Sequence, residues 1–169
     1  MFKNISIVMG YYNRKELFNN TLEQFVRLGY EKYNLEIVVA DDCSKPSEQL
    51  DDIIFKYPFK IKLIKILEKK YYNPVIAYNI AINHISVDTD IVIFQNPEIY
   101  HCGDIIQHAI QGLNDNVYFV YPVMSTCQQD AHRLVNNKFN NYYTEFVEKI
   151  TVYEGKHLRS RKGWYIHHI

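Results

Sequence analysis

The chain of 169 residues contains little cysteine, glycine or proline, with three, six and five residues respectively. Cys43, Cys102 and Cys127 are an odd number without metal-ligand spacing, which favours unpaired thiols in a reducing compartment. The formal net charge is zero, which argues against a protein that binds nucleic acid through bulk positive charge. The chain also lacks a long apolar run and opens without a secretory leader, so we expect a cytoplasmic protein, in a bacterial or host cytosol, with no transmembrane segment.

What the chain has instead is a series of short apolar runs rich in β-branched residues. Five of them have the length and composition of buried strands: 5–9, 36–40, 61–67, 90–94 and 117–123. Four segments between them repeat apolar residues at three- and four-residue steps, which predicts helices: 17–28, 50–57, 75–85 and 105–113. Gly29 and Pro58 end the first two of these segments. The alternation predicts an α/β fold with a mostly parallel central sheet and right-handed crossovers.

Polar side chains follow three of the predicted strands. The turn at 11–14 follows the first strand, Asp41 and Asp42 follow the second, and the segment 95–98 follows the run at 90–94. Because ligands of open α/β sheets bind outside the carboxyl ends of the strands, we expect these side chains to form a site. An alternative for Asp41 and Asp42 is a helix N-cap, since Asp-x-Ser is common before helices.

In order and spacing, these motifs resemble the family 2 nucleotide-sugar glycosyltransferases. The resemblance covers roughly residues 4–105 and is carried by four segments: 6–14, 36–44, 73–79 and 94–98. It implies the GT-A fold, a Rossmann-like three-layer sandwich. It also implies an enzyme that transfers a sugar, with inversion, from a nucleoside diphosphate carrier, preferably of uridine. The expected partners are this nucleotide-sugar donor and a glycan, lipid or protein acceptor.

Two residues carried over by position would contact the nucleobase. Tyr12 matches the aromatic residue that lies against the base, and every base presents a π-face to such a ring. Asp42 matches the carboxylate that accepts a hydrogen bond from a uracil imide, a charge-assisted contact. The alternative for Tyr12 is that it packs under the sheet edge. We expect Asp41 to be the structural partner of the acidic pair, capping backbone amides.

Four further residues complete the expected nucleotide site: Asn13, Arg14, Asn73 and Asn79. Asn13 and Arg14 belong to the turn that carries Tyr12. The resemblance places Asn73 and Asn79 near the ribose and diphosphate. Asn73 has a second reading, because an asparagine directly before a proline and a helix can cap that helix.

The expected metal site departs from the family pattern. Where the family has Asp-x-Asp, this chain has Gln95-Asn96-Pro97-Glu98. A subset of the family is similar here, with the same motif followed by a His-x-Gly-Asp segment like that at 101–104. The resemblance implies Mn²⁺ or Mg²⁺ held by Glu98, helped by the carbonyl oxygen of Gln95. Asp104, just before a helical run, has an N-cap as its alternative role.

The last third of the chain is less informative. Helical spacing recurs over 128–150, so we divide the chain into a donor-binding domain, 1–150, and a basic tail, 151–169. The acceptor region of the resembling family, which supplies a catalytic base, has no match here, and Asp130, His132, His167 and His168 are weak candidates for that base. We therefore keep a truncated or non-catalytic nucleotide-sugar-binding or assembly module as the alternative. A nucleotidyltransferase is disfavoured, because Gly10 stands alone where a glycine-rich phosphate loop would lie.

Overall fold

The computed structural model describes residues 3–70, 72–101 and 103–112. Seven regular elements follow one another there: β1 (Asn4–Tyr11), α1 (Lys15–Arg27), β2 (Asn34–Asp41), β3 (Lys60–Lys65), α2 (Val75–Ile82), β4 (Ile91–Phe94) and α3 (Ile105–Gly112). Two short 3-10 helices, η1 (Tyr30–Lys32) and η2 (Pro46–Glu48), flank β2. In these residues, no helix has the length and apolar character that a bilayer crossing needs. The strand expected at 117–123 and the domain boundary at 150 lie outside them.

The four strands form one sheet in the order β3-β2-β1-β4, and every neighbouring pair is parallel. All carboxyl ends therefore meet at one edge, which we call the carboxyl edge. The chain moves outward from β1 to β2 and β3, then crosses back to place β4 on the other side of β1. This reversal makes the gap between the ends of β1 and β4 a topological switch point, where ligands of open α/β sheets bind.

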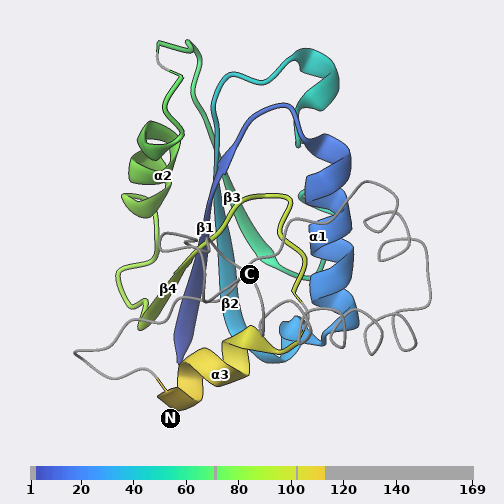
Figure 1. Cartoon of the computed structure of the whole chain (residues 1–169), viewed down its shortest axis with the longest axis vertical. Coiled ribbons are helices and arrows are strands. Elements are labelled where there is room, and N and C mark those ends of the chain that lie inside the picture. Colours follow the sequence, from blue (N-terminus) through green and yellow to red (C-terminus); the bar gives the residue numbers. More distant parts are fainter. Residues whose placement is uncertain (1–2, 71, 102, 113–169) are drawn as a thin grey trace, which may run out of the picture. The chain divides into compact units, whose positions relative to one another are not determined.

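Alternate residues of the central strands pack on opposite faces of the sheet, as the pleat requires. One face carries the larger cluster, in which Ile7 and Ile37 pack with side chains of α1 and α3: Phe18, Leu22, Phe25, Ile106 and Ala109. The other face carries Val8 and Val38, which pack with α2 through Ala77 and Ala81. Figure 1 shows α1 and α2 on opposite sides of the sheet. This arrangement confirms the predicted three-layer α/β fold with a parallel sheet.

The predicted helices are confirmed at three of four places. The first ends at Arg27, and Gly29 follows in the left-handed conformation with φ of 69°. The prediction for 50–57 is wrong, because that segment forms only a turn in which the amides of Ile53 and Ile54 both donate to the carbonyl of Leu50. Leu50 and Ile53 are buried as their spacing requires. Pro58 directly follows the segment, and a proline disfavours the helical conformation of the residue before it, here Tyr57.

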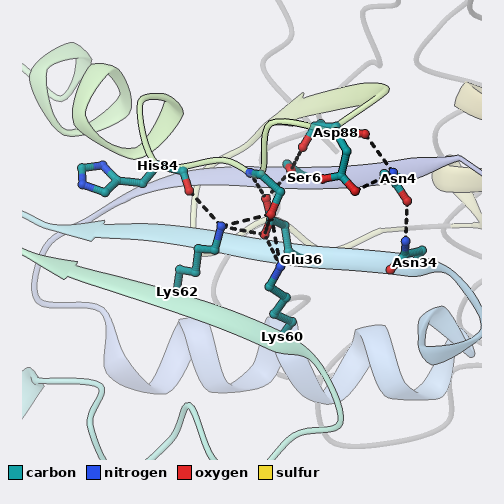
Figure 2. Close-up of polar contacts among 10 residues, drawn as sticks. Asn4, Ser6, Asn34, Glu36, Lys60, Lys62, His84 and Asp88 are labelled. Atoms are coloured by element: carbon teal, nitrogen blue, oxygen red, sulfur yellow. Dashed lines mark hydrogen bonds and ion pairs between the residues drawn. The ribbon is translucent and has the colours of Figure 1, made fainter.

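A buried polar cluster lies near the start of β2, away from the carboxyl edge (Figure 2). Glu36 accepts hydrogen bonds from Ser6 Oγ at 2.8 Å and from the amide and hydroxyl of Ser86 at 2.6 and 2.7 Å. The ammonium groups of Lys60 and Lys62 lie 3.1 and 3.0 Å from Oε2, the oxygen that also accepts from the Ser86 hydroxyl. Burial alone would raise the pKa of Glu36, but these hydrogen bonds outweigh it and hold that pKa well below its ordinary value. The cluster thereby ties the loop before β4 to the sheet.

Candidate functional site

The two loops that follow β1 and β2 are held together by hydrogen bonds from backbone amides to side-chain oxygens. Asn13 has a positive φ of 51°, which asparagine tolerates better than most residues. Its amide donates to Ser44 Oγ at 2.9 Å, and its side-chain oxygen accepts from the amide of Lys45 at 2.9 Å. Asp41 is buried and accepts from the amide of Ser44 at 2.9 Å. Asp41 therefore accepts from a backbone amide as expected, and Asn13 shapes the same junction.

Tyr12 and Asp42 face each other across one lysine. The ammonium of Lys69 lies 3.4 Å from the centroid of the Tyr12 ring and 2.6 Å from Asp42 Oδ2. A cation over an aromatic face and beside a carboxylate is stabilised by both. Because one small group touches both residues, the ring face and the carboxylate border the same small volume at the carboxyl edge. The structure thus brings together the two side chains expected to contact a nucleobase.

Gln95, at the end of β4, points into the core rather than out at the edge. It is fully buried, and its Oε1 lies 2.9 Å from His101 Nε2. The other ring nitrogen of His101 lies 2.9 Å from the hydroxyl of Tyr30, so this histidine anchors the strand end to η1. Among the described residues, Gln95 Nε2 has no hydrogen-bond partner. With its carbonyl oxygen on His101, Gln95 is not placed to help a metal ion as we expected.

Tyr78 of α2 fixes the next residue of this strand end. Its hydroxyl lies 2.7 Å from Asn96 Oδ1 and 2.9 Å from the carbonyl oxygen of Gln95. Burial, with a smaller contribution from the nearby charge of Glu98, raises the pKa of Tyr78 to about 12. Tyr78 therefore remains a neutral hydroxyl donor at neutral pH, and it ties α2 to the segment that carries Glu98.

Glu98 is bound to Arg14 across the switch point. Arg14 Nη1 lies 2.6 Å from Glu98 Oε1, and the two side chains are 49% and 25% exposed. Glu98 Oε2 is buried and has no hydrogen-bond partner within the described part of the chain. In that same part, no three His, Cys, Asp or Glu side chains lie close enough to hold a metal ion. The expected metal ligand thus has an arginine as its cationic neighbour.

The remaining expected site residues divide into three groups. Asn73 has its alternative role, because its Oδ1 accepts from the amide of Val75 at 3.0 Å at the start of α2. Asp104 likewise caps α3 by accepting from the amide of Gln107 at 3.0 Å. Asn79 lies exposed on α2. The candidate bases lie outside the described residues: Asp130, His132, His167 and His168.

Two residues at this edge were not expected from the sequence, Lys69 and Tyr78. Lys69 lies in the loop after β3, an edge strand of the sheet. That loop holds two adjacent lysines, Lys69 and Lys70, which was the available signal. Tyr78 falls within the predicted helix 75–85, and the apolar spacing of that segment carries no signal of its hydroxyl.

Solved structures similar to this chain include S. aureus TarS and the mannosyltransferase PcManGT. S. aureus TarS is 22% identical with a TM-score of 0.52, over 63% of this chain and 19% of that one. The mannosyltransferase PcManGT from Pyrobaculum calidifontis, solved in complex with GDP-Man and Mn²⁺, is 19% identical with a TM-score of 0.58, over 79% of this chain and 39% of that one. This chain therefore spans well under half the length of either protein. At such identities the likeness shows the fold, of the GT-A type.

Comparison with protein-family models assigns the chain to a family, which the structural likeness alone does not. No curated protein matches it. The model of glycosyl transferase family 2, in contrast, matches residues 6–168, which is nearly the whole sequence. That match agrees with the parallel sheet and with the polar side chains gathered at its carboxyl edge. This chain belongs to glycosyl transferase family 2.

Proposed function

We propose that the carboxyl edge binds the nucleoside diphosphate of a sugar donor, with uridine as the preferred base, for inverting transfer to a glycan, lipid or protein acceptor. The observation that carries this proposal is the shared contact of Lys69 with Tyr12 and Asp42. It supports a single pocket in which an aromatic face and a carboxylate acceptor are both available to a planar base that carries an imide N–H.

The two side chains suit the two properties of such a base. The Tyr12 ring is 42% exposed, so its face is accessible for stacking once Lys69 moves aside. Asp42 is partly buried, and a hydrogen bond from an imide to a carboxylate is stronger there than in open water. Lys69 must leave Asp42 for this contact to form, and its ammonium would then be free to approach the phosphates.

Transfer itself requires an acceptor oxygen to bond to the anomeric carbon while the bond from that carbon to the diphosphate breaks. In the proposed geometry the diphosphate lies at the switch point between β1 and β4, near Arg14. Asn79, exposed on α2, is proposed to contact the ribose or the phosphates. The proton of the acceptor goes to a general base, for which Asp130, His132 and His167 stay predictions.

The nucleotide preference is tested by isothermal titration of UDP, GDP, CDP and ADP into the full chain. We expect UDP to bind most tightly. Asp42→Asn keeps the shape of the side chain and removes the charge, so it should weaken UDP binding by about 1.5–3 kcal/mol. Asp88→Asn is the matched control, because Asp88 precedes β4 and lies at the opposite edge of the sheet.

Equal affinity for the four nucleotides would refute the base preference and leave glycosyl transfer to be tested with other donors. Release of UDP or GDP from a panel of nucleotide sugars, with and without candidate acceptors, tests the transfer step. Tight binding of a donor without any turnover would favour the alternative function, a module that binds nucleotide sugars.

A further inference from the structure

The oxygens at the end of β4 that a metal ion could use are already engaged. Gln95 Oε1 is hydrogen-bonded to His101, and Asn96 Oδ1 accepts from the hydroxyl of Tyr78. Glu98 Oε1 lies on Arg14, which leaves only Oε2 of that carboxylate, buried and unpartnered among the described residues. Mg²⁺ and Mn²⁺ require several oxygen ligands with favourable charge. The side chains present here do not fit a divalent cation.

The charge balance of the carboxyl edge points in the same direction. Two partly exposed carboxylates there have a basic partner, Lys69 for Asp42 and Arg14 for Glu98. Asp41 is buried and Glu48 is partly exposed, and each of them accepts a hydrogen bond from a backbone amide, that of Ser44 and that of Lys15. A dication is drawn to uncompensated negative charge, and this edge offers little of it. A diphosphate, which brings its own negative charges, is drawn to the basic side chains instead.

The Arg14 side chain has the charge and the free hydrogen-bond donors that a diphosphate requires. A guanidinium carries five N–H donors in a planar fork, and one ion-pair contact, from Nη1 to Glu98, uses only part of that fork. The side chain is 49% exposed, so its other donors are accessible from solvent. Arg14 follows β1 and Glu98 follows β4, so the pair spans the switch point where the proposed donor binds.

We infer that Arg14, held in place by Glu98, supplies the positive charge that a divalent cation would otherwise bring to the donor diphosphate, and that the donor binds without metal. This inference rests on the proposed function. Glu98 acts as a positioning residue, since it orients the guanidinium and need not touch the donor. Loss of Arg14 would free Oε1 of Glu98, and with Oε2 already unpartnered among the described residues the carboxylate could then accept a cation.

The test is isothermal titration of UDP and of GDP into the full chain, each in EDTA and in Mn²⁺. For the wild-type chain, we expect the dissociation constant of the better nucleotide to differ by less than about twofold between the two conditions, because the charge is already supplied. Arg14→Met should weaken binding about tenfold or more in EDTA. Mn²⁺ should restore part of that loss, because Glu98 is then free to hold the ion.

Two further variants keep the result interpretable. Arg27→Met removes an exposed arginine from the last turn of α1, away from the carboxyl edge, and should leave nucleotide binding unchanged. Glu98→Gln leaves Arg14 its charge and an acceptor, so it should bind the nucleotide in EDTA within about threefold of the wild-type chain. Circular dichroism of each variant confirms that it is folded before its affinity is compared.

The outcomes separate this inference from the proposed function. If no variant and no wild-type sample binds UDP or GDP in either condition, the proposed donor site is refuted. If the wild-type chain binds only with Mn²⁺, or if Glu98→Gln abolishes a metal-dependent gain, the donor site stands and the role given to Arg14 is overturned. If Mn²⁺ does not restore binding to Arg14→Met, a cation held by Glu98 cannot take the place of the arginine, and the inference fails.

Discussion

Replacing Glu36 with glutamine should destabilise the fold by about 3 kcal/mol at pH 7, although the change keeps the shape of the side chain. Glu36 is only 5% exposed and accepts two hydrogen bonds at Oε1, from Ser6 and the amide of Ser86. In the variant, each of these hydrogen bonds has a neutral acceptor in place of a charged one, which weakens it by roughly 1 kcal/mol. The substitution also removes the ion pairs of Glu36 with Lys60 and Lys62. This loss adds only about 1 kcal/mol to the destabilisation, because both lysines are partly exposed to solvent.

The same interaction gives stability a defined dependence on pH. The pKa of Glu36 is depressed in the folded chain from an unfolded value of 4.5. A depressed carboxyl pKa stabilises the fold above the unfolded value, and that contribution is lost as pH falls toward the folded value. The gap in unfolding free energy between the wild-type chain and Glu36→Gln should therefore narrow by about 1.4 kcal/mol for each pH unit below 4.5.

Urea denaturation followed by circular dichroism at pH 7, 4 and 3 measures both effects. Glu31→Gln is the matched control, because Glu31 is exposed on η1 and its loss should change stability by no more than about 0.5 kcal/mol. Comparing variants at the same pH cancels the contribution of the other carboxyls. Equal stability of Glu36→Gln and Glu31→Gln at pH 7 would refute the reasoning, as would a gap that stays constant down to pH 3.

Two further substitutions probe the carboxyl edge. Gly10→Ala would place a Cβ 3.3 Å from the ring of Tyr78, and the hydroxyl contacts of Tyr78 prevent that ring from moving away. The free energy of unfolding should therefore fall by about 1–3 kcal/mol, which thermal denaturation measures. An unchanged melting temperature would contradict this. Lys69→Met frees Asp42 for the base, so uridine without phosphates should bind on the order of fivefold tighter by titration calorimetry, a gain of about 1 kcal/mol. Lys70→Met removes only an exposed ion pair with a neighbouring glutamate and should not change uridine binding. A loss of affinity in Lys69→Met would count against a base site bordered by both Tyr12 and Asp42.

The sequence was most informative where local rules decide the structure. The continuous burial of β1 and β2 was readable because a strand covered on both faces is an unbroken apolar run. The helices α1 and α2 were readable because their apolar residues recur with the helical period. The capping contacts at Asp41, Asn73 and Asp104 span two or three residues, so the sequence could name them. The segment 50–57 has helical spacing and no helix, because spacing reports which residues are buried and not whether a helix can nucleate.

The sequence by itself determined the layered fold and the polar character of the strand ends, since burial patterns and strand boundaries are written in neighbouring residues. Only the tertiary structure decided which charge meets which at those ends. Lys69 reaches Asp42 across 27 positions, and Arg14 reaches Glu98 across 84. Both contacts depend on the strand order, above all on the crossover that sets β4 beside β1. No local pattern encodes that order, so the partners of Asp42 and Glu98 emerge only when the sheet is assembled.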